Sequence, residues 1–192
     1  MIGSSHRSNI GRTLVGGTGE RLLSGAPAPV AVAPAGYATG GGRGIQVVGC
    51  GFDGSPESRR ALAWAAQLAR VASARLRVLS VYEPTLPASL AVGGGLAAAS
   101  INDVLRRERE EELAQAEAAL DPEIDASAKL LVRDARDLLA RQSGELDLLV
   151  VGSRGYGPLR AVLLGSVSSA LVRSAQSPLV VVPRAANGDY RE

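Results

Sequence analysis

The chain has 192 residues, which is more than one domain of about 150 residues and well short of two. Apolar residues make up 46% and charged residues 21%, so a disordered chain is excluded because enough apolar surface exists to offset chain entropy. The net charge of +2, without a basic stripe interleaved with aromatics, excludes a nucleic-acid-binding surface.

The sequence also argues against a disulfide, a Cys/His metal site, a membrane segment and a secretory signal. Cys50 is the only cysteine, so no internal disulfide forms, and a reducing cytoplasm is the expected location. His6 is the only histidine, which excludes a metal site built from Cys and His. The uncharged stretch from Pro84 to Asn102 contains prolines and a glycine triplet, so we expect a loop there and no membrane contact. The amino terminus lacks the pattern of a secretory signal.

After a glycine-rich linker at residues 35–44, apolar strand patterns alternate with amphipathic helix patterns. This alternation predicts an α/β fold with a parallel sheet and right-handed crossovers. Ser55 is the expected N-cap of the first helix, with Pro56 at its first position. The predicted strands are Ile45–Phe52, Leu76–Tyr82, Ala126–Val132, Asp147–Val151 and Pro178–Val182, and the predicted helices are Pro56–Ala72, Ile101–Leu120, Asp134–Gln142 and Ser166–Ser174.

An internal repeat accounts for the length of the chain. Residues 3–34 align without a gap on residues 152–183, with nine identical positions that include Gly3/Gly152, Pro29/Pro178 and Pro34/Pro183. Matched glycines and prolines reflect similar backbone demands. We therefore interpret the first 34 residues as the closing loop, helix and strand of a preceding domain of the same type. Pro29–Ala33 is then an orphan strand, predicted to pair with the exposed edge of the fifth strand.

Two glycine patterns are candidate ligand-binding motifs. The first, Gly49-x-Gly51-x-x-Gly54, satisfies the dinucleotide fingerprint, and Glu83 follows the second strand where an acidic residue would contact a ribose. Asp53, however, lies in the turn where the pyrophosphate would bind, and the helix starts after the third glycine instead of beneath it. An NAD-linked oxidoreductase is therefore the alternative interpretation.

The second pattern, Gly152-x-x-Gly155 followed by Gly165-Ser166, runs from the end of the fourth strand to the start of the last helix. Glycines let a backbone approach phosphates closely, and the free amides of Ser166 and Val167 predict an anion site at a helix N-terminus. Arg154 lies in the same loop and would add positive charge.

With Phe52-Asp53-Gly54-Ser55-Pro56 after the first strand and Ser177–Pro183 at the end, the second pattern resembles the universal stress protein family. The resemblance covers about residues 45–184. It implies an open five-stranded parallel sheet of order 3-2-1-4-5 with helices on both faces, a Rossmann-like fold of the adenine nucleotide alpha hydrolase type. The complete Gly-x2-Gly-x9-Gly-Ser pattern is that of the ATP-binding branch of the family, so ATP with Mg²⁺ is the implied ligand.

The resemblance also assigns residues to the ligand. Asp53 would lie near the ribose and phosphates and help hold Mg²⁺, and Val81 would offer backbone groups to the adenine. The remaining positions follow the two motifs and would hold the ribose and phosphates: Gly51, Phe52, Gly152, Arg154, Gly155, Gly165, Ser166 and Val167. A homodimer or pseudo-dimer through the fifth strand, Pro178–Val182, is implied as well.

We therefore expect four segments: a remnant of a preceding domain at residues 1–34, a linker at 35–44, a universal-stress-type domain at 45–185 and a tail at 186–192. The expected function is that of an ATP-binding regulatory module with at most slow hydrolysis, and no catalytic residue is assigned. Besides the NAD-linked enzyme, a dimerisation scaffold that binds no nucleotide stays open.

Overall fold

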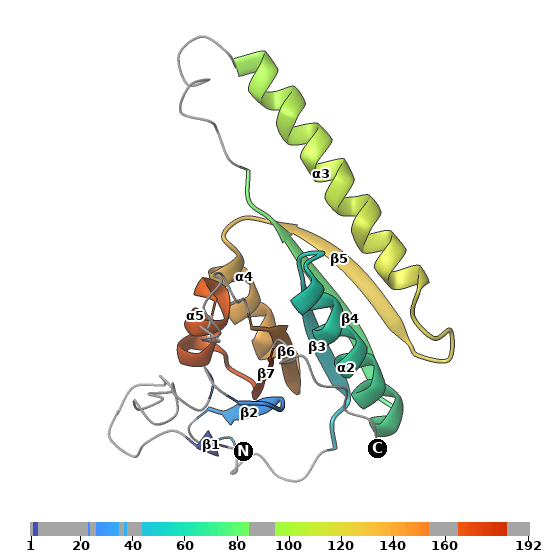
Figure 1. Ribbon diagram of the computed structural model, residues 1–192, viewed down its shortest axis with the longest axis vertical. Helices are drawn as coiled ribbons and strands as arrows, with labels where there is room; N and C mark the ends of the chain where they lie inside the picture. Colours follow the sequence, from blue (N-terminus) through green and yellow to red (C-terminus); the bar gives the residue numbers. More distant parts are fainter. Residues whose placement is uncertain are drawn as a thin grey trace.

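The structure is a computed structural model, and it describes residues 2–3, 23, 26–34, 37, 44–84, 95–153 and 165–183. Helices cover both faces of one mainly parallel sheet (Figure 1). In sheet order, the strands are β1 (Ile2–Gly3), β2 (Val30–Ala33), β7 (Leu179–Val182), β6 (Leu148–Gly152), β3 (Val47–Phe52), β4 (Arg75–Tyr82) and β5 (Ala126–Val132).

The five strands predicted after residue 45 are present, mutually parallel, and in the predicted order, since β5-β4-β3-β6-β7 is 3-2-1-4-5. The predicted number of strands is wrong, because β2 and the short β1 extend the sheet to seven strands. The extension has a physical cause: β7 would otherwise expose an unpaired row of backbone groups. The predicted pairing of Pro29–Ala33 with the fifth strand is confirmed, since β2 runs antiparallel to β7.

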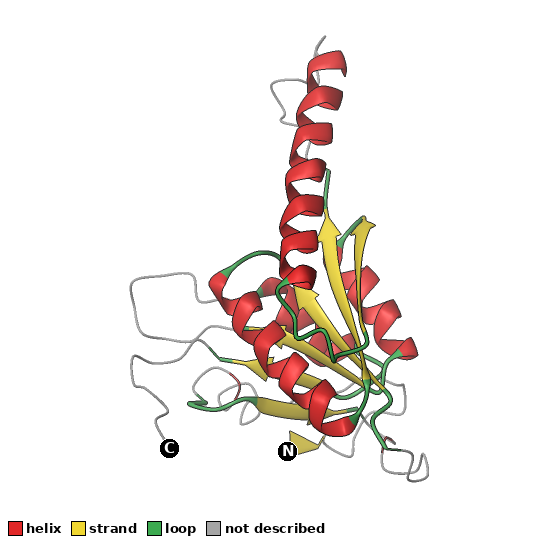
Figure 2. Cartoon of the chain, turned by 90° about the vertical axis from the view of Figure 1, so that its right-hand side faces the viewer, coloured by secondary structure: helices red, strands yellow, loops and turns green. Residues whose placement is uncertain are grey.

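The helices are α2 (Pro56–Ala72), α3 (Gly95–Ala118), α4 (Ala135–Gln142) and α5 (Ser166–Ser174), with a short 3₁₀ turn at Ser143–Glu145. The prediction for α2 is confirmed, because the Ser55 hydroxyl accepts the Ser58 amide proton and Pro56 follows. Helix α3 begins at Gly95 instead of Ile101, since the segment after Gly95 is rich in alanine, a strong helix former. Its N-terminal part extends beyond the sheet (Figures 1 and 2). No helix in the described part of the chain is long and apolar enough to cross a membrane.

The core consists of two apolar layers, one on each face of the sheet. Along β6 and β7 the side chains alternate between them: Val150 and Val180 join α2 and α3, whereas Leu149 and Leu179 join α4 and α5. Strands buried on both faces explain the continuous apolar runs in the sequence. Cys50 lies in the first layer with no exposed surface, and burial raises the pKa of its thiol to about 12. Cys50 is therefore a packing residue.

The added strands repeat the geometry of the last two strands of the sheet. Ile2 pairs with Val32 and Gly3 with Ala33, while Val151 pairs with Val181 and Gly152 with Val182. A shift of 149 residues, the offset of the sequence repeat, converts the first set of pairs into the second. Strand β2 also meets β7 symmetrically: Val30 pairs with Val181, Val32 with Leu179, and Ala31 with Val180 at the centre. If each residue is replaced by its equivalent 149 positions away in the repeat, the same three residue pairs are obtained.

The burial of Val32 gives a test of the strand pairing. Its side chain is 3% exposed within the layer that contains Leu179 and Val181. A Val32→Asp substitution would bury an unpaired charge and should lower the free energy of unfolding by about 3 kcal/mol. Urea denaturation measures the change, with Ala28→Asp at an exposed position before the strand as the control. Equal stability of the two variants would contradict a packed β2.

Candidate functional site

A cavity of about 540 Å³ opens at the edge of the sheet where β3, β4 and β6 end. These are adjacent strands, and open α/β sheets bind ligands outside the carboxyl ends of their strands where strand order reverses. The volume is in the range of small-molecule and cofactor sites. The cavity is therefore where the fold type is expected to hold a ligand.

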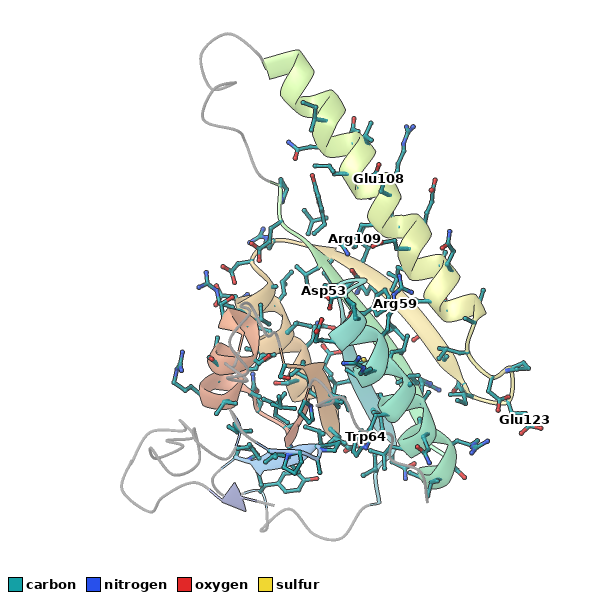
Figure 3. All side chains as sticks on the ribbon, in the orientation of Figure 1. Asp53, Arg59, Trp64, Glu108, Arg109 and Glu123 are labelled. Carbon is teal, nitrogen blue, oxygen red and sulfur yellow. The ribbon has the colours of Figure 1, made fainter. Side chains whose placement is uncertain are left out.

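The turn after β3 forms one wall of the cavity. The Asp53 carboxylate accepts hydrogen bonds from the amide and the hydroxyl of Ser55, and Gly54 adopts a φ of 75° that favours glycine. Both carbonyls of the turn accept hydrogen bonds from arginines, Asp53 from Arg109 and Gly54 from Arg59. Figure 3 labels both arginines beside Asp53. The turn is therefore held in place before any ligand arrives.

The opposite wall is the N-terminus of α5 with the end of β6. Gly165 is the N-cap, and no side chain caps this end of the helix. Ser166 and Val167 line the cavity, so the positive end of the helix dipole faces it. The Ser168 hydroxyl donates to the Gly152 carbonyl at 2.9 Å, which ties α5 to β6. This end of α5 is suited to an anion.

Gly152 is required for a reason that sequence reasoning did not identify. A Cβ atom at this position would lie 2.7 Å from the backbone carbon and oxygen of Glu57 in the first turn of α2. Glycine therefore lets the end of β6 pack directly against α2, which brings the two N-terminal helix ends to one cavity.

Helix α3 contributes a third wall that the sequence did not predict. Leu105, Glu108, Arg109 and Glu112 line the cavity, spaced so that they share one helix face. Arg109 donates through Nη1 to the Asp53 carbonyl and to the Glu112 carboxylate, the latter at 3.0 Å. In a sequence, a charged run such as Arg106–Glu112 usually indicates a solvated helix face. The exposed pair Arg106–Glu110 fits that interpretation, but the Arg109 face does not.

On the side of α4, acidic residues cap the helix. The Glu83 carboxylate accepts the Ala135 amide proton at 2.7 Å, and Asp134 accepts those of Arg136 and Asp137. The Arg136 guanidinium beside Asp134 lowers the pKa of that carboxyl to about 2. The segment 132–136 therefore provides a helix cap, and Ala135 lines the cavity.

The structure brings most of the predicted site residues into this one cavity. Arg154 and Gly155 lie outside the described residues. The other eight line the cavity: Gly51, Phe52, Asp53, Val81, Gly152, Gly165, Ser166 and Val167. Lining residues outside the predicted ATP site come mainly from helices: Ser55, Glu57, Ser58, Leu79, Tyr82, Glu83, Leu105, Glu108, Arg109, Glu112, Ala135, Leu139, Val151 and Ser168.

The competing glycine pattern has a packing explanation. A Cβ atom at Gly49 would lie 2.3 Å from the Leu146 side chain, so this glycine makes room inside the fold. Neither Gly49 nor Gly54 lines the cavity, although Gly51 does. The three glycines do not form one loop around a pyrophosphate, and Glu83 is used to cap α4.

No group of three or more metal-binding side chains gathers within the described ranges. Asp53 is a hard oxygen ligand beside the predicted phosphate site, and Mg²⁺ is commonly held by one or two carboxylates together with phosphates and water. The residues present therefore fit a cation that arrives with a nucleotide.

Sequence comparisons identify related proteins. The sequence model of the universal stress protein family matches residues 44–183. A universal stress protein of Mycobacterium tuberculosis is 34% identical over 69% of this chain and 46% of its own length. A second one from the same organism is 31% identical over 94% of this chain and 60% of its own length. The chain thus spans about half the length of the curated relatives it matches.

The fold is shared with a solved structure. A functionally unknown protein of Pseudomonas aeruginosa superposes with a TM-score of 0.69 at 16% identity, covering 96% of this chain and 62% of its own. A universal stress protein solved in complex with cAMP is 30% identical, with a TM-score of 0.49, and covers 73% of this chain and 98% of its own.

The packing of Gly152 predicts a strong effect of a single methyl group. Gly152→Ala would force β6 and α2 apart and should cost about 2 kcal/mol of unfolding free energy. Gly44→Ala is the control, because the nearest atom to a Cβ there is 3.9 Å away, on a side chain. Thermal or urea denaturation compares the two, and a Gly152→Ala protein as stable as the control would contradict the close contact.

Proposed function

The chain belongs to the universal stress protein family, and on that basis we propose that it is an ATP-binding regulatory module. The observation that carries the proposal is the cavity into which the Asp53 turn and the uncapped N-terminus of α5 both open. Eight residues that the resemblance assigns to the nucleotide converge there from three strand ends and one helix.

The lining chemistry supports a nucleotide with its base and phosphates at opposite ends of the cavity. Leu79, Val81 and Leu139 offer an apolar surface for the adenine, with the backbone of Val81 as its hydrogen-bonding partner. Gly152, Gly165, Ser166 and Val167 surround the proposed phosphate end, where the α5 amides supply donors. We assign Arg154 and Gly155 to the same end from their place in the motif.

We propose that ATP binds with Mg²⁺ and is hydrolysed slowly at most. Five carboxylates line the described cavity, against the single cation Arg109, so a divalent cation would reduce their repulsion of the phosphates. Asp53 is the proposed protein ligand of that cation. Its carboxylate accepts two hydrogen bonds from Ser55, which makes it a poor general base.

The cytoplasmic location expected from the sequence remains a prediction.

Titration calorimetry with ATP, AMP and NAD tests this function, using wild type and Gly165→Asp. Gly165 has a φ of −62°, and aspartate is a favoured N-cap residue, so the variant should fold while placing a negative charge at the phosphate site. We expect the variant to bind ATP at least about tenfold more weakly than wild type. Gly44→Asp, on an exposed residue outside the cavity, is the control and should bind ATP like wild type.

Other outcomes assign the other functions. Tight binding of NAD without ATP would favour the oxidoreductase. Binding of neither ATP nor NAD would favour a scaffold that dimerises without binding a nucleotide.

We further propose that residues 1–34 are the remnant of a preceding domain, joined by a linker at 35–44 to a universal-stress-type domain at 45–185 with a tail at 186–192. Supporting this, β1 and β2 pair in the register of β6 and β7. The pairing of β2 with β7 is symmetric under exchange of equivalent residues, as in a dimer of two fifth strands. In this proposal the chain supplies its own second half, a pseudo-dimer in place of a homodimer at this edge.

Removal of residues 1–43 tests the pseudo-dimer. The truncated protein would expose the edge of β7, whose own side chains are buried and apolar, and should associate through it. Sedimentation velocity should show concentration-dependent dimers of the truncated protein that the full chain does not form. Hydrogen exchange at Leu179–Val182 distinguishes pairing from aggregation, because amides in a new strand pair stay protected. Identical association of both proteins would contradict the proposal.

A further inference from the structure

Arg109 is the only cation among the described residues that line the cavity. It lies on the face of α3 that closes the cavity, between Glu108 and Glu112. Figure 3 shows it between α3 and the Asp53 turn. Its side chain is 31% exposed, so water and salt ions screen its charge less than they screen that of a fully exposed arginine.

The hydrogen bonds of Arg109 leave donors for a ligand. Both protein contacts, to the Asp53 carbonyl and the Glu112 carboxylate, are made by Nη1. A guanidinium carries five N–H donors, so one N–H on Nε and two on Nη2 are not used in these contacts. Within the described part of the chain these two nitrogens have no hydrogen-bond partner. They form a planar fork, which matches the spacing of phosphate oxygens.

The two contacts also fix where that fork lies. The Asp53 carbonyl holds the guanidinium beside the turn that the proposed nucleotide contacts, and Glu112 holds it from within the same helix. The Glu112 carboxylate in turn lies against Gly54, since a Cβ atom there would be 2.6 Å from its oxygen. Arg109 is therefore positioned in advance, with little side-chain freedom to lose on binding a ligand.

We propose that Arg109 binds the phosphate groups of the nucleotide and makes the site select ligands by their negative charge. The proposal rests on the ATP-binding function above and adds a specificity residue outside the glycine motifs. Glu112 has two effects on Arg109: it orients the guanidinium, and its negative charge offsets part of the positive charge that attracts the phosphates. The neighbouring Arg106 pairs with Glu110 and does not line the cavity, so it has no such role.

The test compares ATP with adenosine, which lacks phosphates, by calorimetry at fixed Mg²⁺ and ionic strength. Arg109→Gln should weaken ATP binding about tenfold, the order expected for losing one charge close to the ligand. Its adenosine affinity should stay within roughly twofold of wild type, because a charge acts little on a neutral ligand. Arg109→Lys should keep much of the ATP affinity, and Glu112→Gln should raise it. Arg106→Gln removes the same charge from the same helix and should change neither affinity by more than about twofold.

Each remaining outcome overturns a defined part of the account. Equal losses for ATP and adenosine in Arg109→Gln would mean that Arg109 only supports the turn. Equal effects of Arg109→Gln and Arg106→Gln would mean that only the overall charge matters. Unchanged ATP binding in Arg109→Gln would refute the assignment of Arg109 while leaving the ATP site intact. A wild-type protein that binds adenosine but not ATP, or neither, would overturn the proposed function itself, and this inference with it.

Discussion

The direct contact of β6 with the first turn of α2 is the constraint on which the cavity depends. Gly152 permits it, because any side chain there would collide with the backbone of Glu57. With that contact in place, the Asp53 turn before α2 and the uncapped end of α5 face the same space. The hydrogen bond from Ser168 to the Gly152 carbonyl then fixes α5 as well. A single position without a side chain thus aligns two helix ends and two strand ends.

A second constraint acts at the other side of the sheet. A strand with both faces buried, such as β7, needs a partner on its outer edge, and β2 supplies one from within the chain. The site and this edge are joined through β6 and β7, since Gly152 pairs with Val182 at the cavity end. Loss of β2 would therefore remove support from β7 and, through β7, from β6, the strand that leads to the proposed phosphate site.

The sequence alone predicted the parallel sheet, the capping of α2 and the place of Pro29–Ala33, because each depends on local patterns or on the repeat. The strand order came from the family resemblance. The strand count was wrong, since β1 has only two residues and carries no apolar pattern of its own. Helix α3 was predicted too short because its first residue is the last glycine of a triplet, and glycine is a poor helix former. The α3 wall was missed because Arg109 reaches Asp53 across 56 positions of sequence, a contact that no local pattern encodes.

The central claim is that an adenine nucleotide occupies the cavity between the Asp53 turn and the start of α5. Amide chemical shifts of the ¹⁵N-labelled protein during a titration with Mg²⁺ and ATP test it most directly. The account predicts the largest shifts at Asp53, Val81, Ser166 and Val167, with small shifts at the far end of α2 near Val71. Shifts that are absent, or that concentrate away from the carboxyl ends of β3, β4 and β6, would contradict it.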